Sequence, residues 1–283
     1  MAATISSVLV HARGLLKEHS IESADIDADI LLAHVLHLRR IDLIIHRDRV
    51  LEDEEVDIFN SLLGRRLKRE PVAYIIGEKE FFGRCFFVNE NVLVPRPETE
   101  ILVEQAIALS PEGAGVFEIG VGSGAVIISL LCERDDLKGF GNDISIETLA
   151  TARANAESHG VSSRLRLFAG NTLRGLCTSW PVIIANPPYI PLNDESILED
   201  DVRLYEPSAA LYGGKDGLVV VRDIMSELSG HLAPGGLLIM EAGQGQKDAI
   251  DTVVSAHDTL RVRSWVSDLA GIPRTVIIER MHG

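Results

Sequence analysis

The sequence Asn186-Pro187-Pro188-Tyr189 combines residue types that could hold a planar amino group for reaction. A proline ring fixes φ at about −65° and has no N–H, so two in succession form a rigid segment whose carbonyl groups are free to accept hydrogen bonds. An NH₂ group could donate one hydrogen to the Asn186 side-chain oxygen and the other to the Pro187 carbonyl, with Tyr189 packed on its flat face. The alternative is a cis-proline turn with a purely structural role.

A glycine-rich loop is the second motif with recognisable chemistry. The sequence Gly120-Val121-Gly122-Ser123-Gly124 follows a short apolar run and precedes a helical pattern. Glycines let the backbone turn tightly and approach a ligand, while the free N–H groups at the start of a helix point toward it. The GxGxG spacing lacks the GxGxxG period of the dinucleotide fingerprint, which argues against a nicotinamide oxidoreductase.

Asp143 lies at the end of the next apolar run along the chain. A carboxylate in that position can accept hydrogen bonds from both hydroxyls of a ribose. Together with the glycine loop it predicts a nucleoside ligand. The alternative is that Asp143 caps the helix that follows Ile144.

A regular alternation of short apolar runs and helical patterns must position these motifs. It is typical of βαβ units and of a mainly parallel sheet covered on both faces. The glycine loop follows the first run, Asp143 ends the second, and Asn186 follows the fourth. We predict an α/β fold with seven strands at Gly115–Ile119, Gly139–Asp143, Leu165–Ala169, Val182–Ala185, Leu237–Glu241, Val262–Val266 and Thr275–Glu279.

The chain before the sheet has a different texture. Apolar residues recur at helical spacing from Ile5 to Leu16, from Ile30 to Leu38 and from Val56 to Leu67. Aromatic and β-branched residues interrupted by glycines then predict a hairpin. We therefore expect a small all-helical recognition domain at 1–73, a β-hairpin linker at 74–94 and the sheet domain at 95–283.

Composition restricts the partners and the compartment. The chain has 27 Lys and Arg against 42 Asp and Glu, a formal net charge of −15, which is the wrong sign for a protein that binds nucleic acid through phosphates. We expect the one dense basic run, Arg65–Arg69, to be a solvated helix end. Three cysteines without a CxxC pair, and no apolar stretch of the ~20 residues that a membrane span needs, favour a cytoplasmic protein without structural disulfides, metal or membrane contact.

The glycine loop and the acidic strand end resemble the cofactor site of class I S-adenosylmethionine-dependent methyltransferases, which have a Rossmann-like sheet. In that family an acidic residue at the position of Glu118 engages the methionine end, and the residues after the third strand contact adenine. Asn171 and Thr172 occupy that last position here. The resemblance implies cofactor contacts from Glu118, Gly120, Val121, Gly122, Ser123, Gly124, Asp143, Ile144, Asn171, Thr172 and Asn186.

NPPY after the fourth strand resembles methyltransferases that act on planar nitrogens, either in DNA bases or in a protein glutamine. Residues outside the sheet favour the glutamine enzymes, because they resemble the signature of the release factor glutamine methyltransferases, the HemK/PrmC family. The resemblance covers nearly the whole chain and rests on Pro71–Glu78, Phe81–Gly83, Val92–Glu100, Asp27–Leu36, Val202–Pro207 and Gly213–Leu218. The block Pro95–Glu100 is highly specific.

This resemblance implies methylation of the glutamine in the Gly-Gly-Gln loop of class 1 peptide release factors, with Asn186, Pro187, Pro188 and Tyr189 binding the amide. The helical domain would grip the release factor. No general base is expected, since no side chain could remove an amide proton at neutral pH. The alternatives are a DNA adenine methyltransferase that shares NPPY and a catalytically silent binding module.

Overall fold

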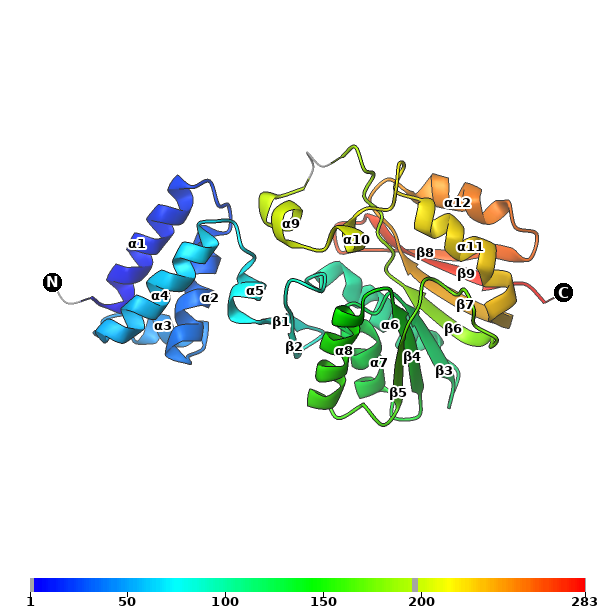
Figure 1. Ribbon diagram of the computed structural model, residues 1–283, viewed down its shortest axis with the longest axis horizontal. Helices are drawn as coiled ribbons and strands as arrows, with labels where there is room; N and C mark the ends of the chain where they lie inside the picture. The colour runs from blue at the N-terminus through cyan, green and yellow to red at the C-terminus, as the bar shows by residue number, and fades with distance from the viewer. Residues whose placement is uncertain (1–2, 195–197, 283) are drawn as a thin grey trace. The chain divides into compact units, whose positions relative to one another are not determined.

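The computed structural model describes residues 3–194 and 198–282, which divide into two compact units (Figure 1). One unit comprises Met1–Gly77 and Glu199–Tyr205, and the other comprises Glu78–Leu198 and Glu206–Gly283. The functional boundaries that we expect, at residues 73 and 94, stay predictions. None of the helices in the described part of the chain is long and apolar enough to cross a membrane.

The first unit is helical, as expected. Its largest helices bury one apolar face each in a common core; on α1 this face consists of Ile5, Leu9, Ala12 and Leu16. The short helix α3 was not predicted, because six residues are too few for a periodic pattern. The helices are α1 (Ile5–Glu18), α2 (Ala24–Leu36), α3 (Arg40–Ile45), α4 (Asp53–Arg66), α5 (Val72–Ile76) and α9 (Asp200–Tyr205).

Helix α5 corrects the expected start of the hairpin. Residues from Tyr74 to Ile76 are helical, although their β-branched and aromatic character favours a strand. Pro71 precedes the helix and Gly77 ends it with a φ of 80°, so local capping residues decide the conformation. The hairpin therefore begins only at β1 (Glu78–Phe81), which pairs with β2 (Arg84–Phe87).

The basic run also differs from expectation, since Arg66 is only 4% exposed. Its guanidinium donates to the Asp27 carboxylate at 2.7 Å and lies 3.2 Å from an oxygen of Asp201 on α9. A charge buried this deeply requires partners of opposite sign, and the sequence between residues 66 and 201 gives no sign of their proximity. The prediction of a solvated helix end was wrong for this residue.

The second unit contains the expected α/β fold with seven strands. The strand order is β5-β4-β3-β6-β7-β9-β8, and β9 runs in the direction opposite to that of the other six strands. The bounds are β3 (Gly115–Ile119), β4 (Lys138–Asp143), β5 (Leu165–Ala169), β6 (Trp180–Ala185), β7 (Leu232–Glu241), β8 (Leu260–Ser267) and β9 (Pro273–Arg280).

Helices cover both faces of this sheet (Figure 1), so its central strands are almost continuously apolar. One core packs beneath α6 (Glu100–Leu109), α7 (Ala125–Glu133) and α8 (Ile146–Ser158). The other packs beneath α11 (Val219–His231) and α12 (Lys247–Ser255). Two short segments, η1 (Pro97–Thr99) and α10 (Ser208–Leu211), complete the unit.

Candidate active site

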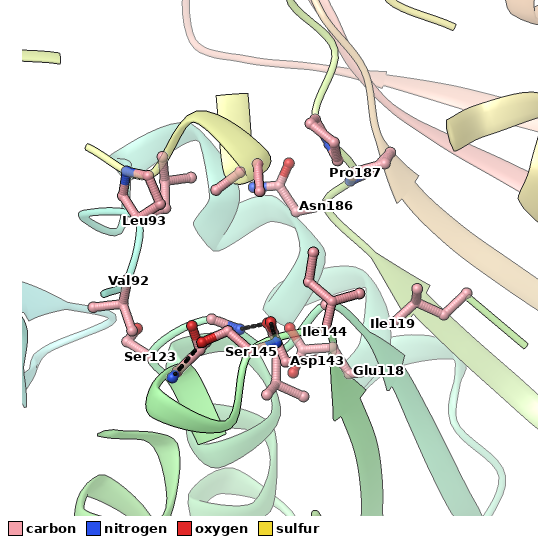
Figure 2. A pocket seen from close by; sticks show the side chains of 18 of the residues that line it. Val92, Leu93, Glu118, Ile119, Ser123, Asp143, Ile144, Ser145, Asn186 and Pro187 are labelled. Carbon is pink, nitrogen blue, oxygen red and sulfur yellow. Dashed lines mark hydrogen bonds between the residues drawn. The ribbon is translucent and has the colours of Figure 1, made fainter. Parts of the chain in front are cut away.

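A cavity of about 350 Å³ opens at the carboxyl ends of the central strands. The chain proceeds outward from β3 through β4 to β5, and then crosses to β6 on the other side of β3. Such a switch in direction leaves a crevice beside the first strand, where open α/β sheets bind ligands. Figure 2 shows Asn186 and Pro187 on one side of the cavity, across from Ser123, Asp143 and Ser145.

The glycine loop between β3 and α7 forms part of the cavity wall. Gly120 and Gly122 have φ values of 70° and 55°, which side chains rarely adopt. A Cβ atom at either position would meet no atom of residues 3–194 or 198–282 within 4 Å, so the space beside the loop is open to a ligand in this part of the chain. Gly124 does not line the cavity; it caps α7 with a φ of 80°, and its missing side chain makes room for Ile128.

Asp143 ends β4 and faces the same cavity. Its carboxylate accepts hydrogen bonds from the backbone N–H groups of Gly122 and Ser145, both at 3.1 Å. Burial raises the pKa of Asp143. The cap of α8 is Ser145 and not Asp143, so the capping alternative was wrong. Beside it Ile144 is 61% exposed and presents an apolar surface to the cavity.

Glu118 lies deeper, with 2% of its surface exposed. One carboxylate oxygen accepts from the backbone N–H of Ile127 at 3.1 Å. Burial raises the pKa of Glu118 well above its ordinary value, and the nearby Asp143 carboxylate adds to this effect. A cationic group in the cavity would favour the ionised form again. Glu118 is therefore suited to a positively charged ligand.

The segment after β5 contributes unequally. Asn171 is exposed and lines the cavity. Thr172 also lines it but is buried with a φ of 50°, and its hydroxyl donates to Glu227 at 2.7 Å. Its carbonyl accepts from the side chain of Asn142 at 2.7 Å. The hydroxyl of Thr172 is therefore already engaged. Because Thr172 is buried and Ile144 is exposed, Ile144 offers the larger apolar surface to the cavity.

The NPPY segment follows β6 and forms the opposite wall. The side-chain nitrogen of Asn186 donates to Thr99 Oγ1 at 3.3 Å, and Pro187 and Pro188 line the cavity. No cis peptide bond precedes either proline, which excludes the cis-proline turn. Tyr189 is not among the lining residues; its ring packs against Gly243, and its contact with a substrate amide stays a prediction.

Arg96 and Thr99 also line this wall. Thr99, which η1 brings to the cavity, donates its hydroxyl to Glu241 at the end of β7, at 2.7 Å. Arg96 forms an ion pair with the carboxylate of Glu206 at 2.5 Å. In sequence these partners are far apart, and only the motif containing Arg96 and Thr99 could have drawn attention to them.

Comparison with known proteins supports the same family for both units. The family description "PrmC N-terminal domain" matches residues 7–77, and "Methyltransferase small domain" matches residues 97–199. A protein of Nitratidesulfovibrio vulgaris named release factor glutamine methyltransferase is 40% identical over 282 residues, which cover 98% of this chain and 96% of that protein. The chain belongs to the release factor glutamine methyltransferase family. A Caulobacter vibrioides member is 38% identical over 98% of this chain and 96% of its own.

Solved structures agree with this family in fold. A methyltransferase from Pyrococcus furiosus has a TM-score of 0.55 at 20% identity, covering 79% of this chain and all of that one. The resemblance to the HemK/PrmC family and the class I methyltransferase fold are thus confirmed. In the described part of the chain no group of three or more His, Cys, Asp or Glu side chains could hold a metal ion.

Proposed function

We propose that this protein transfers the methyl group of S-adenosylmethionine to the side-chain nitrogen of the glutamine in the Gly-Gly-Gln loop of class 1 release factors. One observation carries most of the weight. Asn186 and Pro187 line a cavity at the switch point of the sheet, together with the glycine loop and Asp143. An amide acceptor site therefore faces a nucleoside-type site across a single cavity.

The cofactor would lie along the glycine loop. Its adenosine ribose would bind Asp143, and its adenine would rest on Ile144 with Asn171 at the edge. The positively charged methionine end would approach Glu118, whose raised pKa a cation would lower. When bound, S-adenosylmethionine supplies an electrophilic methyl group on a sulfonium. The wider set of contacts that we propose is Glu118, Gly120, Val121, Gly122, Ser123, Asp143, Ile144, Asn171, Thr172 and Asn186, with Gly124 shaping the loop.

The substrate amide would be held by its two N–H bonds. Asn186 Oδ1 and the Pro187 carbonyl each accept one of them, and Pro188 stiffens the segment. An amide nitrogen is a weak nucleophile because its lone pair is delocalised into the carbonyl. As that nitrogen attacks it gains positive charge, so both hydrogen bonds strengthen in the transition state.

Orientation supplies the rest of the rate increase. Holding nucleophile and electrophile in line can contribute about 7–11 kcal/mol in well-oriented systems. No side chain needs to remove the amide proton beforehand, since the proton becomes acidic once the nitrogen carries the methyl group and can then leave to water. We therefore assign no general base and no metal.

The helical unit would recognise the release factor. Its short helix α3 exposes three isoleucines, Ile41, Ile44 and Ile45, by 51%, 69% and 63%. Scattered apolar side chains are normal on a surface, but three on one six-residue helix form a patch suited to a protein partner. We also propose that the protein works in the cytoplasm, where release factors act and where its cysteines, which form no disulfide in the structure, would stay reduced.

The test is to incubate the protein with S-adenosylmethionine and either a class 1 release factor or a DNA duplex. Mass spectrometry should find one added methyl group on the loop glutamine and none on a release factor whose loop glutamine is replaced by alanine. Methylated adenine in the duplex, with an unmodified release factor, would support the alternative of a DNA enzyme. A net charge of −15 argues against that outcome.

A further inference from the structure

Three side chains from separate elements form a hydrogen-bonded chain behind the NPPY segment. Asn186, just after β6, donates its side-chain NH₂ to Thr99 Oγ1 at 3.3 Å. Thr99, the last residue of η1, donates its hydroxyl to Glu241 Oε2 at 2.7 Å. Glu241 is the last residue of β7, the strand beside β6 in the sheet. The chain therefore runs from the cavity wall into the protein interior.

Burial gives this chain a fixed direction. Thr99 and Glu241 are each 4% exposed, so water is not a ready alternative partner for the threonine hydroxyl. An ionised carboxylate can only accept hydrogen bonds, and a hydroxyl has a single hydrogen to donate. While Glu241 is ionised, the Thr99 hydrogen must therefore go to Glu241. Its oxygen is left to accept, and the end of Asn186 that can satisfy it is the NH₂ group.

The two ends of an asparagine amide have nearly the same shape but opposite hydrogen-bonding roles. If Asn186 turned by 180°, it would present a donor instead of an acceptor to an incoming NH₂ group. Two donors facing each other cannot form a hydrogen bond. The value of Asn186 as an acceptor therefore depends on which end Thr99 holds.

We propose that Thr99 and Glu241 are positioning residues, which hold the Asn186 amide with its oxygen toward the substrate nitrogen. This inference rests on the proposed function, because it assumes that Asn186 accepts from a glutamine amide. Neither residue needs to contact that amide itself. Their effect is to keep one orientation of Asn186 populated before the substrate arrives.

The hydrogen-bonded chain Asn186–Thr99–Glu241 also predicts that turnover depends on pH. Burial raises the pKa of Glu241 to about 7. Arg274 and Arg96 favour its ionised form, while Glu98 and the nearby Tyr189 complete the titratable groups that interact with it. A protonated Glu241 could donate to Thr99, whose hydroxyl could then donate to the Asn186 oxygen and favour the reversed amide. Turnover should therefore rise as the pH increases through about 7.

Two buried threonines provide a matched pair of variants. We call the hydrogen-bonded side chains of Asn186, Thr99 and Glu241 the relay. Thr99→Val removes the hydroxyl at the centre of the relay and keeps the shape of the side chain. Thr275→Val does the same at a threonine on β9 that is 0% exposed and whose hydroxyl has no hydrogen-bond partner among the described residues. Thr99→Val should lower kcat about 10- to 100-fold, as expected for a misoriented reacting group, and leave the KM for the release factor unchanged. Thr275→Val should retain full kcat, and Thr99→Ser should restore it.

Glu241→Gln provides a second measurement in case Thr99→Val does not fold. The glutamine oxygen can still accept from Thr99, but the group no longer titrates. Its kcat should lose the rise near pH 7 that the unsubstituted protein shows. An unaltered pH profile in Glu241→Gln, or equal kcat values for Thr99→Val and Thr275→Val, would overturn the inference.

A readout without turnover separates this inference from the proposed function. The ¹⁵N signal of the Asn186 side-chain amide, assigned by its loss in Asn186→Asp, should shift with a midpoint near pH 7. The shift should vanish in Thr99→Val and persist in Thr275→Val. A signal that titrates equally in both variants would contradict the relay. Failure of the unsubstituted protein to methylate a release factor would instead contradict the proposed function and leave this spectroscopic result to decide on the relay.

Discussion

The backbone N–H of Gly122 donates a hydrogen bond to the Asp143 carboxylate at 3.1 Å, which ties the loop after β3 to the end of the neighbouring strand β4. The same carboxylate accepts from Ser145, so two backbone groups fix its orientation. A carboxylate held in this way is ready to accept from a diol without first rearranging. Preorganisation of this kind lowers the cost of binding.

Asp143→Ala should weaken the binding of S-adenosylmethionine. Hydrogen bonds to a charged group contribute about 1.5–3 kcal/mol, which corresponds to a rise of about 10- to 100-fold in the dissociation constant. Isothermal titration calorimetry measures it directly. Asp135→Ala is the control, because that side chain is 99% exposed. An unchanged dissociation constant for Asp143→Ala would show that the ribose assignment is wrong.

Asn186→Ala should lower kcat by about 10²–10³-fold, because one preorganised acceptor is removed. Binding of S-adenosylmethionine should survive, since the glycine loop and Asp143 are untouched. Asn193→Ala, at an exposed asparagine further along the same segment, should keep its activity. Near-normal turnover by Asn186→Ala would remove this residue from the mechanism.

Two glycines with almost the same φ angle allow the effect of backbone strain on stability to be distinguished from the effect of ligand contact on binding. Gly120 has a φ of 70° and Gly113 a φ of 69°, and a Cβ at either would meet no atom of the residues that the structure describes within 4 Å. Alanine should therefore cost both sites a similar stability, on the order of 1–2 kcal/mol. Only Gly120→Ala should weaken cofactor binding, because only Gly120 lines the cavity. Calorimetry measures the dissociation constant of the cofactor for each variant. Equal values would show that Gly120 does not contact the cofactor.

The buried ion pair between Arg66 and Asp27 makes the helical unit sensitive to substitution. Arg66→Ala should reduce the free energy of unfolding by about 3–5 kcal/mol, since it leaves the buried carboxylate of Asp27 without its cationic partner. Arg65→Ala should have a much smaller effect, because that side chain is 41% exposed. Urea unfolding followed by circular dichroism compares the two. Equal losses would mean that burial of Arg66 is unimportant for stability.

Glu241 should make the unliganded protein less stable as the pH rises. Its pKa is about 7 in the folded protein against 4.5 as its ordinary value, so the folded state binds more protons between these limits. The free energy of unfolding therefore falls as the pH rises through that window, in total by about 3 kcal/mol from this group. Relative to the unsubstituted protein, Glu241→Gln should gain stability from pH 4.5 to 7. A constant difference between the two across this range would show that the pKa of Glu241 is not raised.

Much of this architecture follows from local patterns in the sequence. The strands Gly115–Ile119 and Leu165–Ala169 have the bounds that their apolar runs predict. A strand buried on both faces must be apolar over its whole length, so its ends are sharply marked. Because the motifs directly follow such strands, their meeting at one edge of the sheet was predictable as well.

The remaining features depend on tertiary contacts that no local pattern encodes. Thr99 and Glu241 lie 142 residues apart, and nothing in either neighbourhood indicates a hydrogen bond. The burial of Arg66 likewise depends on Asp201, in a helix that begins eleven residues after Tyr189 but belongs to the helical unit. Helix α5 shows that a cap can outweigh β propensity over five residues.

A crystal structure of the protein with S-adenosylhomocysteine and a Gly-Gly-Gln segment of a release factor tests the central claim most directly. We predict that the glutamine nitrogen lies within hydrogen-bonding distance of both Asn186 Oδ1 and the Pro187 carbonyl, with the cofactor sulfur on its far side. A glutamine held elsewhere, or an Asn186 oxygen pointing away from the glutamine nitrogen, would contradict it.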